Sequence, residues 1–255
     1  MRVVLVTLKK ELMSHCFSPV SYVIAVLFYL FRGFDVASSS LLFFYVPTDP
    51  DAFSMNYYGL PTTFVMTVLV PPLLTMRCFA EERRSGSLET LMTAPVRDFE
   101  IVLGKWLGAV LFYCLLWFPS VVLLWVLTRG PFLGTELAFG PVFSAYLGLF
   151  LLASLLMAVG CFTSSLTDNV LLAVLAAILF NFALIQAPRM IYPYVRPYLE
   201  NHAIAELYQK LEVMDHFSNW FARGLVDTSL IAFYLAGAFC FLVLTCLSLQ
   251  SRKLQ

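Results

Sequence analysis

Long apolar stretches alternate with short polar ones along this chain. Six of the apolar stretches are long enough to cross a hydrocarbon core of about 30 Å as helices. They cover residues 19–43, 60–79, 101–127, 141–162, 169–187 and 228–249. This pattern predicts an all-α, polytopic integral membrane protein in which residues 1–255 form a single transmembrane domain.

The residues before the first span have a different pattern. Residues 1–16 carry basic side chains and also leucines at helical spacing, namely Arg2, Lys9 and Lys10 with Leu5, Leu8 and Leu12. The spacing predicts an amphipathic helix that lies at the inner membrane interface. The alternative is a frayed tail whose charges only set the orientation of the chain.

Composition supports the membrane assignment. Hydrophobic residues make up 60% of the chain and charged residues 13%, and the mean hydropathy is +0.84. A soluble fold of this size could not bury so much apolar surface, and a disordered chain would be far more polar. The formal net charge is zero, so no basic field favours binding to nucleic acid.

The distribution of basic residues predicts the orientation. With six spans, both termini lie on one side of the membrane, and most of the basic residues lie at or near that side: Arg2, Lys9, Lys10, Arg77, Arg83, Arg84, Arg97, Lys105, Arg252 and Lys253. The other side has Arg129, Arg189, Arg196, Lys210 and Arg223. The positive-inside rule therefore predicts cytoplasmic N- and C-termini and a multi-pass protein of the cytoplasmic (inner) membrane.

Three local features shape the expected spans. Pro71 and Pro72 are expected to kink or unwind the second span. Thr167 or Asp168 is expected to cap the fifth. An outer segment, residues 188–226, is expected to begin in an extended conformation because it contains three prolines, Pro188, Pro193 and Pro197.

Polar residues inside apolar stretches are candidate functional positions. Arg32 and Asp35 are three residues apart and can face each other on a helix, either as an intramembrane pair or at a helix end from which they reach water. Asn181 and Gln186 are expected to form hydrogen bonds between helices or to line a path.

Arg223 and Asp227 precede the last span and are four residues apart. On a helix this spacing permits an ion pair that would anchor the start of the span. The alternative is an unpaired, solvated face.

The polar segment between the second and third spans is the most informative part of the chain. Acidic and basic residues alternate from Glu81 to Arg84, and Gly86 then permits a turn. Leu88, Leu91 and Met92 fall on one face of a short helix that Pro95 ends. Such an element can insert into a groove on a soluble partner, although an ordinary charged loop would have the same composition.

The stretch from Phe79 to Lys105 resembles the cytoplasmic signature of ABC-2 type transporter permeases. In that family a run F-A-E-E-[RK]-x-x-G-[ST]-L-E-x-L-[LM]-x-x-P precedes E-I-V-L-G-K, and this chain departs little from it. Weaker similarity covers 14–22, 162–167 and 217–227. Within that family, the chain most resembles the gliding-motility-associated (GldF-like) permeases, to which nitrous-oxide-reductase maturation permeases are related.

The resemblance implies a permease subunit that couples ATP hydrolysis by a separate ATPase homodimer to export or to mechanical work. It also implies pairing with a second permease chain, the same or related, within the lipid bilayer. The residues implied to contact or orient the ATPase are Glu81, Glu82, Arg83, Arg84, Gly86, Leu88, Glu89, Leu91, Met92 and Pro95.

The chain has no nucleotide-binding loop of its own. The nearest approach to one, Gly104-Lys105-Trp106, lacks the hydroxyl residue that follows the lysine in a P-loop. No cofactor or metal site is expected, and the chain is not expected to be an enzyme. A membrane scaffold of a gliding or cofactor-maturation complex, without a transported substrate, is the alternative function.

Overall fold

The computed structural model describes residues 2–45, 61–87, 97–129, 139–195, 208, 211–213, 216 and 220–253. Within these residues the chain is helical and contains no strand. The helices are α1 (Arg2–Phe17), α2 (Pro19–Tyr45), α4 (Pro61–Thr75), α5 (Ala80–Arg84), α7 (Asp98–Arg129), α8 (Phe139–Leu166), α9 (Val170–Val195), the 3₁₀ helix η2 (Phe221–Arg223) and α12 (Thr228–Lys253).

Five of these helices, α2, α7, α8, α9 and α12, are long and apolar enough to cross a membrane. Helix α4 has 15 residues in the described part of the chain, which corresponds to about 22 Å and is shorter than a hydrocarbon core. The expected second span therefore remains a prediction, and so does the count of six.

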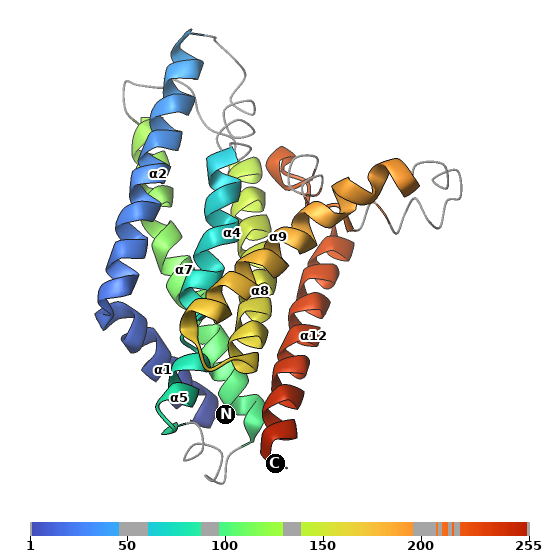
Figure 1. Ribbon diagram of the computed structural model, residues 1–255. Helices are drawn as coiled ribbons and strands as arrows, with labels where there is room; N and C mark the ends of the chain where they lie inside the picture. The colour runs from blue at the N-terminus through green and yellow to red at the C-terminus, as the bar shows by residue number, and fades with distance from the viewer. Residues whose placement is uncertain are drawn as a thin grey trace.

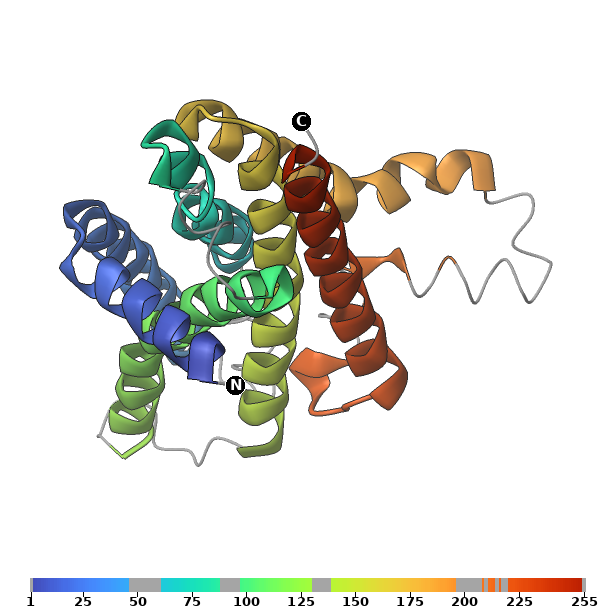
Figure 2. The same cartoon turned by 90° about the horizontal axis from the view of Figure 1, so that it is seen from below.

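Helix α8 lies at the centre of the bundle and packs against α4, α7, α9 and α12 (Figure 1). Helix α1 runs across one end of the bundle and packs along α7, as the view from below also shows (Figure 2). Both chain termini lie at the end that carries α1 and α5 (Figure 1). The side of the membrane that this end faces remains a prediction.

Small residues allow close helix crossings. A Cβ on Gly160 of α8 would overlap Oγ1 of Thr75, and a Cβ on Gly104 of α7 would lie 2.8 Å from the Cβ of Thr7. A Cβ on Gly108, one turn further along α7, would lie 2.7 Å from the Cβ of Glu11. Association of helices in lipid depends on this kind of packing, so these glycines fix where α1 and α4 cross their neighbours.

The outer segment does not begin as expected. Helix α9 continues through Pro188 and Pro193 to Val195, so the extended conformation predicted from residue 188 onward is wrong. Each proline removes only one backbone hydrogen bond, and neighbouring elements compensate for such losses in membrane helices. The carbonyls that lose their donor are those of Leu184 and Arg189, four residues before each proline. The Tyr208 hydroxyl donates to a different carbonyl, that of Pro188 itself, at 3.0 Å.

The cap of α9 also differs from the prediction. The side chain of Asn169 accepts a hydrogen bond from the Leu171 amide at 2.9 Å, and the helix begins at Val170. Asn169 is therefore the N-cap, because the cap is the residue directly before the first helical one. Thr167 instead accepts from the Asn169 amide, and Asp168 pairs with Arg83.

The two adjacent prolines do not unwind α4. The helix continues through Pro71 and Pro72 and ends one turn later at Thr75, whose hydroxyl donates to the Pro71 carbonyl at 2.9 Å. A turn over residues 76–79 then leads into α5. The break in the chain therefore falls after the prolines, at the point where α4 meets α5.

Candidate functional site

One hydroxyl of α8 binds several backbone groups at the turn between α4 and α5, residues 76–79. Ser164 accepts hydrogen bonds from the amides of Phe79 and Ala80, both at 3.1 Å, and donates to the Met76 carbonyl at 3.0 Å. Ser164 is fully buried. It therefore satisfies backbone groups that the change of direction leaves without helical partners.

A second contact ties α5 to the link between α8 and α9. The Arg83 guanidinium donates to the Ser165 carbonyl at 3.1 Å and pairs with the Asp168 carboxylate. Together with the Ser164 hydroxyl, this contact fixes α5 against the start of α9. Helix α5 is therefore joined to the end of α8 and to the link that leads into α9.

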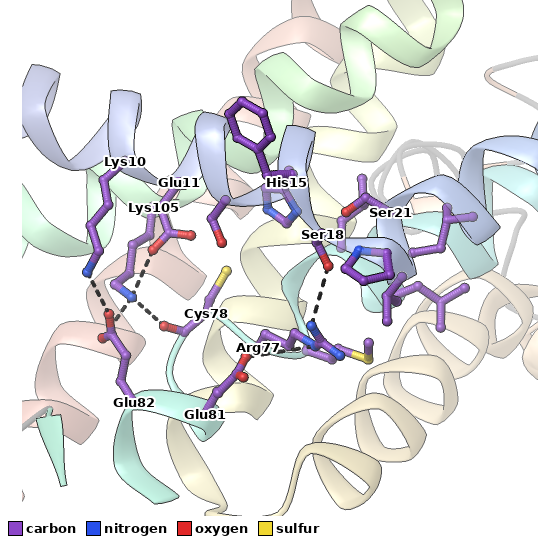
Figure 3. Close-up of a pocket in the computed structure, with 18 of the residues that line it drawn as sticks. Lys10, Glu11, His15, Ser18, Ser21, Arg77, Cys78, Glu81, Glu82 and Lys105 are labelled. Atoms are coloured by element: carbon purple, nitrogen blue, oxygen red, sulfur yellow. Dashed lines mark hydrogen bonds and ion pairs between the residues drawn. The ribbon is translucent and has the colours of Figure 1, made fainter. Parts of the chain in front are cut away.

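Lys105 of α7 is the centre of a third contact, drawn in Figure 3. Its ammonium group lies 3.1 Å from the Glu11 carboxylate and 2.8 Å from the Glu82 carboxylate, and it donates to the Cys78 carbonyl. The lysine side chain is 2% exposed. A buried ammonium needs such partners, because burial without them is strongly unfavourable.

The Lys105 contacts join three elements. Glu11 belongs to α1, Glu82 to α5 and Lys105 to α7, and Lys10 of α1 also approaches Glu82 at 3.5 Å. The lysine ammonium also lies 5.0 Å from the centre of the Phe79 ring, within cation–π range. We call this set of residues, Lys10, Glu11, Phe79, Glu82 and Lys105, the lysine cluster.

Helix α1 reaches the cluster because it packs closely on α7. Gly104 and Gly108 let the α1 backbone approach, and His15 stacks on Phe112 with ring centroids 5.2 Å apart. Leu8 and Leu12 are partly buried, whereas Leu5 is 61% exposed, so the three leucines do not share one buried face. Lying at the membrane interface remains a prediction for this helix.

The predicted coupling residues fall into two groups. Arg84 and Gly86 are exposed, and Glu81 is exposed beside Arg77, whereas Glu82 and Arg83 are partly buried in the contacts above. Gly86 has φ +70°, a conformation that favours glycine, as the predicted turn requires. Leu88, Glu89, Leu91, Met92 and Pro95 lie outside the described residues, as does the short helix expected there.

The structure brings Arg32 and Asp35 together inside the bundle. Nη1 of Arg32 lies 3.1 Å from Oδ2 of Asp35 and 2.6 Å from Oγ1 of Thr63, and the guanidinium lies 4.7 Å from the Trp117 ring centre. Both charged side chains are fully buried, and α2 continues well past them. The pair therefore faces protein, and the alternative in which the helix ends early to let it reach water does not hold.

The remaining intramembrane candidates are separate from this pair. Asn181 is buried and its amide approaches the Leu156 carbonyl at 3.5 Å, which is a long contact between α9 and α8. Gln186 is only partly buried. These positions favour a role in packing between helices over a role in lining one path together with Arg32 and Asp35.

Arg223 and Asp227 do not lie on one helix. The 3₁₀ helix η2 ends at Arg223 and is followed by Gly224, whose φ is +84°, and α12 begins only at Thr228. The Asp227 carboxylate caps α12 by accepting from the Ser229 amide at 2.8 Å. The two side chains are therefore not one helical turn apart, and the ion pair expected from their spacing does not apply. Asp227 instead anchors the last helix as its cap.

Sequence reasoning missed several residues of the site. Lys105 is expected among the basic residues of the inner side and in the family signature, but no contact is predicted for this side chain or for Gly104, and no role is predicted for Glu11 or Ser164. One signal was present in the sequence, because Gly104 and Gly108 form a G-x-x-x-G pattern in an apolar segment, which is typical of close helix contacts. No local signal identifies Ser164, whose partners are more than 80 residues away.

The helices and their exposed apolar side chains define a multi-pass membrane protein. The family model described as ABC-2 family transporter protein matches residues 47–205, more than half of the chain. The chain therefore belongs to the ABC-2 transporter family, whose members are membrane components of ABC transporters that normally work with an ABC ATPase. No curated protein matches the chain in sequence.

Proposed function

We propose that this chain is the permease subunit of an ABC-2 exporter, in which residues 80–95 receive force from a separate ATPase homodimer. The observation that carries the proposal is the lysine cluster. It joins the predicted coupling region to α1 and α7 by buried charge contacts. A surface loop that served only to orient the chain would not need such contacts.

The contacts of α5 connect it directly to several membrane helices. Ser164 and Arg83 connect it to α8 and to the start of α9, and Glu82 connects it to Lys105 of α7. A push on α5 therefore moves several membrane helices together, since packed elements shift as bodies rather than deforming continuously. ATP-driven closure of the ATPase dimer would supply this push.

The rest of the assembly follows from the family. A second permease chain, the same or related, would complete the path through the inner membrane, with the end that carries α1 and α5 in the cytoplasm. The concentration of basic residues at that end favours this orientation. Either export or mechanical work would be the output, and the gliding-motility and nitrous-oxide-reductase maturation permeases are the subgroups we favour.

Gly86→Pro tests the coupling role. Proline holds φ near −65°, whereas Gly86 has φ +70°, so the variant changes the direction of the chain after α5. Insertion into the membrane should be unchanged, and stimulation of the ATPase by the permease should be lost. Gly33→Ala is the control, because its new Cβ meets no atom within 4 Å.

Two results would contradict the proposal. One is normal ATPase stimulation by the Gly86→Pro variant. The other is purification of the intact complex without any ATP-binding chain, which would favour the scaffold function. Glu82→Ala should uncouple the complex in the same way, because it removes the carboxylate that joins α5 to Lys105.

A further inference from the structure

A cavity of about 480 Å³ lies beside the lysine cluster, between α1, the start of α2 and the turn that leads into α5 (Figure 3). Its size falls in the range of about 300–1,000 Å³ that is typical of small-molecule sites. The proposed function assigns it no role.

The position of the cavity points to an amphiphilic ligand. Its wall includes residues from the first turns of α2 and the last turn of α4, where two apolar helices reach one end of the bundle. In the membrane orientation proposed above, on which this inference rests, this end of the bundle lies at the headgroup level of the bilayer. Val20, Ile24 and Leu73 line the apolar part, and Ser14 and Ser18 add hydroxyl groups.

The charges around the cavity are balanced. Three basic side chains and three acidic ones line it: Lys10, Arg77, Lys105, Glu11, Glu81 and Glu82. A ligand with a net negative charge would gain little from such a wall. A zwitterion that carries one charge of each sign matches it better, because each charge finds an opposite partner.

One ion pair in the cavity wall is long and exposed to solvent, so a ligand can replace it. Nε of Arg77 lies 3.8 Å from the Glu81 carboxylate, and the two side chains are 42% and 60% exposed. Arg77 also donates to the Ser18 hydroxyl at 3.4 Å, a long hydrogen bond. By contrast, the carboxylates of Glu11 and Glu82 are held by the buried Lys105 ammonium at 3.1 and 2.8 Å.

We propose that this cavity binds the headgroup of a phosphatidylethanolamine-type lipid, with the phosphate on Arg77 and Ser18 and the primary ammonium on Glu81. Guanidinium groups bind phosphate oxygens in pairs, and a primary ammonium donates hydrogen bonds to a carboxylate. The lipid would exchange one weak, solvent-exposed ion pair for two stronger contacts. A quaternary ammonium headgroup has no N–H to donate, so the site distinguishes it from a primary amine.

The test uses the full-length chain in nanodiscs that contain equal amounts of phosphatidylethanolamine, phosphatidylcholine and phosphatidylglycerol. Lipids that stay bound after release into detergent are counted by native mass spectrometry. The unmodified chain should retain phosphatidylethanolamine about tenfold over either other lipid, as expected for one charge-assisted contact. Equal retention of the three lipids, or preference for phosphatidylglycerol, would overturn the proposal.

Two variants assign the contacts. Arg77→Gln should lower retention of phosphatidylethanolamine about tenfold. Glu81→Gln should remove the preference over phosphatidylcholine while some phospholipid still binds. Arg97→Gln is the matched control, since Arg97 is exposed and does not line the cavity. If Glu81→Gln keeps the full preference, Glu81 is not the ammonium partner and the proposal is wrong.

A soluble compound with the same headgroup is the other possible source. Glycerophosphoethanolamine, added at the same concentration as the lipid, should displace little of it, because it has no acyl chains to contact the apolar wall. Equal displacement would show a soluble ligand and overturn the assignment to a lipid. These results do not depend on the ATPase, so failure here leaves the coupling proposal standing.

Discussion

Replacing Lys105 with methionine tests whether the lysine cluster holds α1 on the bundle. Methionine keeps much of the volume and apolar character of the side chain but removes its charge. The Glu11 and Glu82 carboxylates, which are 12% and 18% exposed, then lose their main partner. Lys10 still lies 3.5 Å from Glu82, so that carboxylate is less affected than Glu11.

The size of the effect follows from these contacts. Breaking a buried ion pair costs about 3–5 kcal/mol. Some of this cost is relieved, because both carboxylates keep partial access to water. The hydrogen bond to the Cys78 carbonyl adds about 1 kcal/mol. A loss of about 3 kcal/mol is therefore expected, which shifts the docking equilibrium of α1 by about two orders of magnitude.

Hydrogen–deuterium exchange of α1 measures this shift directly. Amides of residues 2–17 should exchange faster in Lys105→Met, while α12 should be unchanged. The triple variant with Glu11→Gln and Glu82→Gln should recover most of the protection, because no unpaired carboxylate then remains. Unchanged α1 protection in the single variant, or no recovery in the triple variant, would refute the reasoning.

Three further predictions concern packing and charge in the bundle. Gly104→Ala should weaken the docking of α1 on α7 by about 1–3 kcal/mol, since the new Cβ would lie 2.8 Å from the Cβ of Thr7. The α1 amides should then exchange faster in Gly104→Ala than in the control Gly33→Ala. Arg32→Met should lower the free energy of unfolding in detergent by about 3–5 kcal/mol, because it leaves the Asp35 carboxylate buried without its ion-pair partner. The double variant Arg32→Met with Asp35→Leu should recover most of this loss, and a double variant as unstable as the single one would contradict a buried ion pair. Burial lowers the pKa of His15, with Arg77 adding to the effect and Glu11 opposing it. At low pH, His15 therefore binds a proton more readily when α1 is undocked, so docking of α1 should weaken as the pH falls below about 6.5. If a His15→Phe variant keeps the same pH dependence, protonation of His15 is not the cause.

The apolar pattern predicts the long helices well. The expected spans 19–43, 141–162 and 228–249 correspond to α2, α8 and α12 within a few residues at each end. A long apolar segment in lipid forms a helix, because its backbone N–H and C=O groups must form hydrogen bonds within the segment. Prolines were the weaker guide, since α9 continues through Pro188 and Pro193.

The site could be predicted only in part. The signature from Phe79 to Lys105 identified the charged region around α5, and the structure shows how Glu82 and Arg83 are held there. Their partners come from other parts of the fold, since Lys105 belongs to α7 and Asp168 to the link between α8 and α9. No periodicity within one segment reveals a contact between distant segments. Arg32 and Asp35 could be paired from their spacing, but their burial against Thr63 and Trp117 required the fold.

Site-specific crosslinking to the ATPase tests the central claim most directly. A photoreactive residue is placed at Ser87, which is exposed beside α5, or at Gly140, which lies at the opposite end of α8 from the Ser164 contact. The account predicts that Ser87 crosslinks to a chain whose peptides contain a nucleotide-binding loop, and that Gly140 does not. Crosslinking of that chain from Gly140, or from neither position in an intact complex, would contradict it.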